Sequence, residues 1–179
     1  MVKKNTCIFI SGRGSNLKSL IHYSRSYNFP AKIKLIISNN PDAEGILHAK
    51  KNSIPYFIIN TNKRNYELKI LKKIKKYKIS IICLAGYMKI ISKGFIKNYG
   101  KKIINIHPSL LPEYKGLNTF SRVLKNNEKK TGCSVHFVNE KLDSGKIILT
   151  KKIFLSKNEN EKTLKLKIQN KEYKAYSEA

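Results

Sequence analysis

The chain has 179 residues and a formal charge of +26, and with 41% hydrophobic residues it has the size and composition of one globular domain. No apolar run reaches the roughly 20 residues that cross a membrane, and the N-terminus lacks a signal segment, so we expect a cytoplasmic protein without a membrane partner. The 37 basic residues are spread through nearly every segment without interleaved aromatic residues, which argues against a specific nucleic-acid partner.

The first predicted element is a strand from Thr6 to Ile10, which leads into the glycine loop Ser11-Gly12-Arg13-Gly14-Ser15-Asn16 and then into a helix. Glycines allow a close approach of the backbone to a ligand, and the free N–H groups of a helix start suit an anion. A dinucleotide fingerprint would need a third glycine where Leu17 stands, and the second strand, Ala31 to Ile37, ends without an acid for a ribose. We therefore expect one phosphate of a smaller ligand here. The alternative is a tight turn that binds nothing.

Strand and helix patterns then alternate along the chain. We predict helices over residues 41–51, 64–77 and 93–99, and strands over 54–59, 79–85 and from Lys102 onward. In the helix over 64–77, Leu68, Leu71 and Ile74 are expected to face inward. The strand over 79–85 ends at Gly86, beyond which a ligand could lie against exposed backbone. The three cysteines, Cys7, Cys83 and Cys133, lie in apolar runs and are expected to be buried, reduced thiols.

Beyond Pro112 we predict a loop over 113–119, a helix over 120–126, strands over 132–138 and 146–150, and a closing helix over 157–176. The fold class is α/β, a doubly wound, mostly parallel sheet of Rossmann-like type with a C-terminal antiparallel extension. Residues 1–179 form a single domain in this prediction, with a phosphate-binding half over 1–100 and a catalytic half over 101–179. In such sheets ligands bind beyond the carboxyl ends of the strands.

The strand that opens at Lys102 is interrupted by two polar residues, Asn105 and His107, just before Pro108. Residues two apart on an extended chain point to the same side, so an amide and an imidazole share one face. The alternative is a capped strand end with a satisfied histidine. Asp143 lies in a later turn, where it is either a turn cap or a partner that keeps the His107 ring protonated.

Four segments together resemble the phosphoribosylglycinamide formyltransferases of purine synthesis, from about Cys7 to Tyr176. They are Ser11-Gly12-x-Gly14-Ser15-Asn16-Leu17, Leu84-Ala85-Gly86-Tyr87-Met88, Asn105-Ile106-His107-Pro108-Ser109-Leu110-Leu111-Pro112, and Leu142-Asp143-x-Gly145. The resemblance implies the formyltransferase fold and transfer of a formyl group from the co-substrate 10-formyltetrahydrofolate to the amine of glycinamide ribonucleotide. It also implies small-molecule substrates as the partners, and a monomer or homodimer.

The same resemblance assigns the site residues. Asn105, His107 and Asp143 are implied to be catalytic. Gly14, Ser15 and Asn16 are implied to bind the phosphate. The residues implied to bind folate are Arg64, Met88, Lys89, Ile90, Ile91 and Asn105, with Lys63 as the competing alignment for Arg64. No covalent intermediate is needed, so Ser109 is expected to be structural, and Leu111-Pro112 is expected to be a cis peptide. His22, His48 and His136 lack metal-ligand spacing, so we expect no metal.

Two departures from the family pattern stand out. Asn118 and Phe120 occupy positions where relatives often carry histidines, and the chain stops at Ala179, which we interpret as short of the closing strand usual in the family. The alternatives are therefore a formyltetrahydrofolate hydrolase with the same site, or a truncated, non-catalytic binding protein. A methionyl-tRNA formyltransferase would need a C-terminal RNA-binding domain, which is not evident in this sequence.

Overall fold

The computed structural model describes residues 2–179 and divides into two compact units, one up to Ile104 and one from Asn105 onward. Seven strands form a mostly parallel sheet, and the last two strands pair in the antiparallel sense. The predicted α/β class with an antiparallel C-terminal extension is confirmed.

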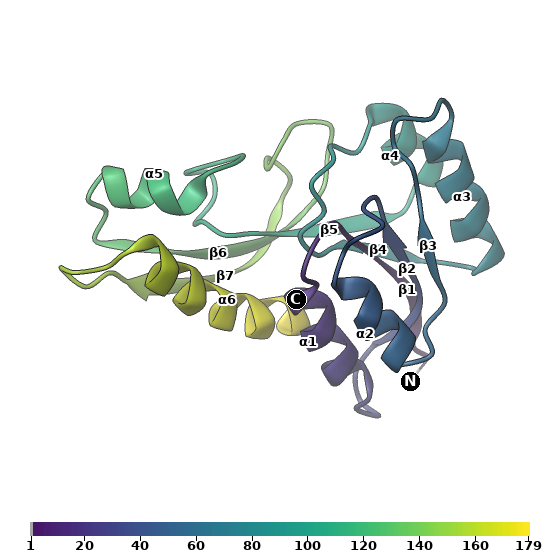
Figure 1. Ribbon diagram of the computed structural model, residues 1–179, viewed down its shortest axis with the longest axis horizontal. Helices are drawn as coiled ribbons and strands as arrows, with labels where there is room; N and C mark the ends of the chain where they lie inside the picture. The colour runs from purple at the N-terminus through teal and green to yellow at the C-terminus, as the bar shows by residue number, and fades with distance from the viewer. Residues whose placement is uncertain (1) are drawn as a thin grey trace. The chain divides into compact units, whose positions relative to one another are not determined.

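The first unit is built on four parallel strands in the order β3-β2-β1-β4. These strands are β1 (Lys4–Ile10), β2 (Ala31–Ser38), β3 (Tyr56–Ile58) and β4 (Ile81–Leu84). The helices are α1 (Ser15–Ser24), α2 (Gly45–Lys51), α3 (Tyr66–Lys76) and α4 (Lys93–Tyr99). Helices α1 and α2 lie together on one face of these strands, and α3 and α4 on the other (Figure 1). This doubly wound arrangement buries β1 on both faces, which explains its continuous apolar run.

Helix α3 departs from the prediction in the face that it buries. Ile70 and Ile74 are buried, whereas Leu68 is 51% exposed, so the prediction that Leu68 faces inward was wrong. Residues four apart lie on one helix face, and here that face is set by Ile70 and Ile74. The helix also begins at Tyr66 and not at Arg64, because Asn65 takes a left-handed conformation with φ of 63°.

The second unit contains the end of β5 (Lys102–His107), together with β6 (Lys130–Phe137) and β7 (Ile147–Phe154), in the order β5-β6-β7. Strand β7 extends four residues beyond the predicted end. Helix α5 covers Thr119–Lys125, and α6 covers Glu161–Glu178. Helix α6 packs along β6 and β7 and buries Leu164 and Ile168 (Figure 1). Its start is fixed by a reciprocal capping box between Asn160 and Thr163.

Over residues 2–179, no helix is both long and apolar enough to cross a membrane. The three cysteines are free and buried, as predicted. Burial raises the pKa of Cys7 and raises that of Cys133 to about 12, so both thiols stay protonated near neutral pH. Neither of these two thiols is poised as a nucleophile.

Candidate active site

The carboxyl end of β5 presents two polar side chains on one face. Asn105 is half-buried and His107 is 5% exposed, while Ile106 between them is buried on the other face. This is the alternation that the spacing predicts for an extended chain. The end of β5 therefore places an amide and an imidazole on the same face of the strand.

The segment after β5 is fixed by buried hydroxyl groups. The Ser134 hydroxyl accepts a hydrogen bond from Leu111 N at 2.9 Å and donates to the Ser109 carbonyl at 2.7 Å. Ser109 itself is fully buried and donates to the Glu113 carbonyl at 2.6 Å. Its hydroxyl therefore has a structural partner. The Leu111-Pro112 peptide is cis, as predicted from the family resemblance.

Asp143 is brought to the end of β5 by a tight turn. Its own φ is +45°, and a Cβ at Gly145 would collide with the Phe137 carbonyl oxygen, so only glycine lets this turn pack against the end of β6. The Gly116 N–H donates to Asp143 Oδ2 at 2.9 Å. The buried carboxylate is therefore oriented by a main-chain donor from a separate loop.

His107 lies between two acceptors. Its Nδ1 is 3.3 Å from Asp143 Oδ2, and its Nε2 is 2.8 Å from the Tyr114 carbonyl oxygen. A carbonyl oxygen only accepts, so Nε2 carries a proton in this arrangement. The protonated ring can donate to both partners at once. The structure thus brings the predicted imidazole and carboxylate together, 36 residues apart in sequence.

Asn105 completes the cluster through its amide nitrogen. Nδ2 is 3.5 Å from Asp143 Oδ1 and 3.2 Å from His136 Nε2. His136 Nε2 is itself 3.7 Å from Asp143 Oδ1. The three residues predicted to be catalytic therefore converge, and a fourth polar residue, His136, joins them.

His136 is the member of the cluster that sequence reasoning missed. Its spacing to the other histidines and to the cysteines argues against a metal ligand and indicates no other role. The spacing Ser134-x-His136 on β6 repeats the spacing Asn105-x-His107 on β5, and it could have indicated a second polar face. Burial lowers the pKa of the His136 ring, and His107 adds to this, while the Phe137 carbonyl and Asp143 act in the opposite direction.

The chemistry that these groups support is proton transfer and stabilisation of negative charge on oxygen. The amide and the imidazole supply N–H donors, and the carboxylate accepts a proton. Within residues 2–179 there is no group of three or more His, Cys, Asp or Glu side chains placed to hold a metal ion.

In the first unit, the glycine loop leads directly into α1. Gly14 has φ of +71°, and a Cβ there would lie 2.6 Å from the Gly45 Cα, so the loop requires glycine at this position. Ser15 is the first residue of α1, and Asn16 is buried in its first turn. The predicted phosphate residues therefore surround the N–H groups at a helix start, although whether they bind phosphate remains a prediction.

The predicted folate segment, Met88 to Ile91, follows β4 in the same unit. The side chains of Met88 and Ile90 are 68% and 75% exposed. The Met88 N–H donates to the Ser11 hydroxyl at 2.8 Å, and that hydroxyl donates to Asn39 Oδ1 at 2.5 Å. Ser11 thereby connects the segment to the strand end that carries the glycine loop.

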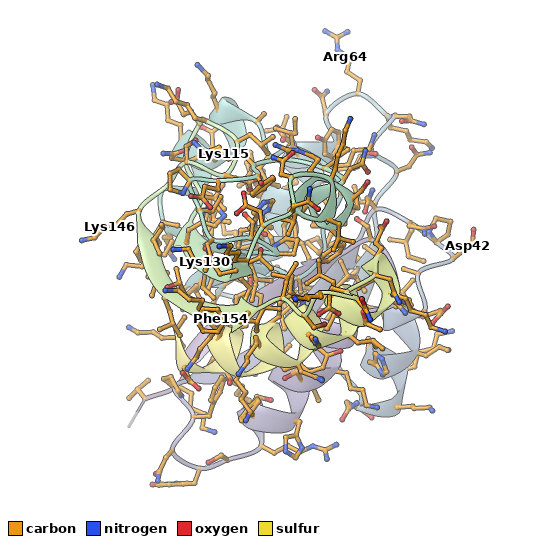
Figure 2. All side chains as sticks on the ribbon, turned by 90° about the vertical axis from the view of Figure 1, so that its left-hand side faces the viewer. Asp42, Arg64, Lys115, Lys130, Lys146 and Phe154 are labelled. Carbon is orange, nitrogen blue, oxygen red and sulfur yellow. The ribbon has the colours of Figure 1, made fainter. Side chains whose placement is uncertain are left out.

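Arg64 lies at the tip of the loop before α3, with its guanidinium extended outward (Figure 2). Three residues on, Glu67 accepts from Ser92 N at 3.1 Å and from the Ser92 hydroxyl at 2.5 Å. The start of α3 is therefore tied to the residue that follows the folate segment. Lys63 is exposed in the same loop, so the competing alignment of these two residues stays open.

Comparisons with known proteins show the family to which this chain belongs. Residues 4–179 match the family described as formyl transferase. The chain is 37% identical to a phosphoribosylglycinamide formyltransferase of Haemophilus influenzae, covering 97% of this chain and 84% of that protein, and 32% identical to the one of Escherichia coli, covering 96% and 83%. The crystal structure of phosphoribosylglycinamide formyltransferase from Anaplasma phagocytophilum superposes with a TM-score of 0.92 at 35% identity, over 98% of this chain and 84% of that one. This chain belongs to the formyl transferase family.

Proposed function

We propose that this chain is a phosphoribosylglycinamide formyltransferase of purine biosynthesis, which moves the formyl group of 10-formyltetrahydrofolate to the amine of glycinamide ribonucleotide. The names of the two relatives support phosphoribosylglycinamide as the acceptor of the formyl group. The observation that carries the chemistry is the convergence of Asn105, His107 and Asp143, with His107 Nδ1 3.3 Å and Asn105 Nδ2 3.5 Å from the carboxylate.

The reaction begins with attack of the neutral amine on the formyl carbon, and negative charge develops on the formyl oxygen. A donor placed for such an oxygen is worth about 3–4 kcal/mol in comparable sites. The His107 Nε2–H is one such donor. Because this N–H is directed at the Tyr114 carbonyl, the formyl oxygen replaces that carbonyl as its acceptor.

The second donor is the amide of Asn105. Its two N–H groups are directed at His136 and at Asp143. The contact with Asp143 is the longer of the two, at 3.5 Å against 3.2 Å. The formyl oxygen therefore replaces Asp143 as the acceptor of that N–H. Both donors then hydrogen-bond to the formyl oxygen, on which the negative charge develops.

Asp143 completes the proton transfer. The new bond joins the amine nitrogen to the formyl carbon, and the bond from that carbon to the folate nitrogen breaks. The amine gives up one proton, and the leaving folate nitrogen gains one. The carboxylate accepts the first and returns the second through a water molecule, so the balance closes without a covalent enzyme intermediate.

The first unit supplies the binding groups in this proposal. Backbone N–H groups of Gly14, Ser15 and Asn16 receive the ribonucleotide phosphate at the start of α1. The exposed segment from Met88 to Ile91 receives the folate, with a cation from Lys63 or Arg64 beside it. Two contacts within the unit support this assignment. Ser11 holds Met88 next to the glycine loop, and Ser92, which follows the segment, bonds to Glu67 at the start of α3.

The test is formation of tetrahydrofolate by the purified chain, with and without glycinamide ribonucleotide. We expect turnover that requires the ribonucleotide, and loss of turnover in Asp143→Asn. Formate release that is indifferent to the ribonucleotide would instead identify a hydrolase. Thermal stabilisation by both ligands without any turnover would identify a non-catalytic binding protein.

A further inference from the structure

His136 is buried at the end of β6, with only 2% of its surface exposed. Its Nδ1 lies 2.8 Å from the Phe137 carbonyl oxygen, which can only accept, so the proton of the neutral ring is on Nδ1. Nε2 therefore carries a lone pair. This tautomer is fixed by the main chain of β6 and not by a substrate.

The lone pair on Nε2 determines which way the Asn105 amide faces. Nδ2 is the only donor atom of that amide, and it lies 3.2 Å from His136 Nε2 and 3.5 Å from Asp143 Oδ1. Turning the amide around would place its oxygen against two acceptors. The orientation of Asn105 is thus determined by its neighbours, since each of them requires a donor.

We propose that His136 is a positioning residue, which acts on the reaction only by fixing the Asn105 amide so that an N–H is available to the formyl oxygen. This inference rests on the proposed function. It assigns a role to a residue that needs no contact with either substrate. It also requires that His136 stay neutral, since a proton on Nε2 would turn the acceptor into a donor and reverse the preference of the amide.

The surroundings of His136 are consistent with a neutral ring. On β5 it faces Asn105 and His107, in the turn it faces Asp143, and on β7 its pairing partner is the uncharged Ile147. Burial and the His107 ring oppose protonation of His136, whereas Asp143 and the Phe137 carbonyl favour it, and burial is the largest of these influences.

Two substitutions test the roles of the two His136 ring nitrogens separately. His136→Gln can place an amide oxygen near the position of Nε2 and retain the acceptor for Asn105. His136→Asn can retain the donor to the Phe137 carbonyl but is too short to reach Asn105. We expect kcat to fall about 10- to 100-fold in His136→Asn, as for other residues that orient a reacting group, and to recover most of that loss in His136→Gln. The KM values for both substrates should change less than about 3-fold, because the proposed role involves no contact between the ring and either substrate.

A double-mutant cycle with Asn105→Ala tests whether His136 acts through the amide alone. We expect the double variant Asn105→Ala/His136→Asn to be no slower than Asn105→Ala, because the amide that His136 positions is already gone. Losses that multiply, or a His136→Gln enzyme as slow as His136→Asn, would overturn the proposal.

A measurement independent of turnover separates this inference from the proposed function. Side-chain ¹H–¹⁵N spectra of the intact wild-type chain report which nitrogen of His136 is protonated. We expect the Nδ1–H tautomer at neutral pH even if the chain transfers no formyl group. A proton on Nε2 would refute the positioning role, whatever reaction the enzyme catalyses.

Discussion

The ligand loops of the first unit and the polar cluster of the second unit are held in different ways. In the first unit, the glycine loop and the Met88 segment are joined through the hydroxyl of Ser11, which pairs with an uncharged amide and a main-chain N–H. In the second unit, two imidazoles and a carboxylate are each less than 10% exposed. The Asn105 amide contacts His136 and Asp143, and Asp143 also contacts His107.

The difference shows which contacts of the molecule depend on protonation. Hydroxyl and main-chain groups keep their hydrogen-bonding roles at every pH near neutrality, so the contacts that Ser11 makes do not depend on protonation. In the cluster, each contact depends on which nitrogen carries a proton. We therefore expect changes in the first unit to alter binding and stability, and changes in the cluster to alter turnover.

The largest expected effect is that of Asp143→Asn, which should lower kcat about 10³- to 10⁴-fold, because an amide does not accept the amine proton. Asp42→Asn makes the same change of charge on an exposed loop of the first unit (Figure 2) and should leave kcat unchanged. Steady-state rates at saturating concentrations of both substrates measure the contrast. An Asp143→Asn enzyme within about 10-fold of wild type would remove the carboxylate from the mechanism.

Gly14→Ala should lower the free energy of unfolding by about 1–3 kcal/mol, because alanine at φ of +71° is strained and its Cβ would lie 2.6 Å from the Gly45 Cα. The KM for the ribonucleotide should rise with it. Gly12→Ala is the matched control, since a Cβ there meets nothing within 4 Å. Urea unfolding of both variants gives the comparison. Equal losses would show that the close approach to Gly45 is not the constraint.

The pH dependence of stability should report the cluster. Burial lowers the pKa of His136 below its usual 6.5, so between the lowered value and 6.5 the unfolded chain binds a proton that the folded chain does not. Stability contributed by this group is therefore fully present above pH 6.5 and falls as the pH drops through that window, by at most about 1.4 kcal/mol per pH unit. The slope should be smaller in His136→Gln, as measured by urea unfolding at several pH values. An unchanged slope would mean that another group is responsible.

Ser11→Ala removes the acceptor of the Met88 N–H and should raise the KM for the folate about 3- to 10-fold, because the segment then populates its binding conformation less often. The kcat should change little. Ser24→Ala removes a hydroxyl that bonds only within α1, to the Ile21 carbonyl, and should leave both constants unchanged. A fall in kcat with an unchanged KM would contradict the division between binding and turnover.

The smallest expected effect is that of Lys89→Ala. Loss of one exposed cation beside the anionic folate should raise its KM about 2- to 5-fold, and the effect should shrink as salt is added. Lys97→Ala, on the exposed surface of α4, removes the same charge away from the segment. If both variants raise the KM equally, the general positive charge of the chain is responsible and Lys89 has no place in the site.

Features that lie within a single stretch of the chain were largely predictable from the sequence. The strand–loop–helix around Gly14, the shared face of Asn105 and His107, and nearly all element positions follow from local periodicity and from the backbone freedom of glycine. The failures came where a local pattern allowed two faces, as in α3, where Leu68 and Ile70 competed for burial. In α3, packing against the rest of the unit buries Ile70 and leaves Leu68 exposed.

Only the tertiary structure decided the protonation pattern of the cluster. The sequence could propose that Asp143 meets His107, but it contained no indication that the Tyr114 carbonyl would fix one imidazole proton and the Phe137 carbonyl the other. A tautomer depends on which acceptor lies within about 3 Å of each nitrogen. That distance is set by how distant segments fold against one another, so periodicity and composition carry no information about it.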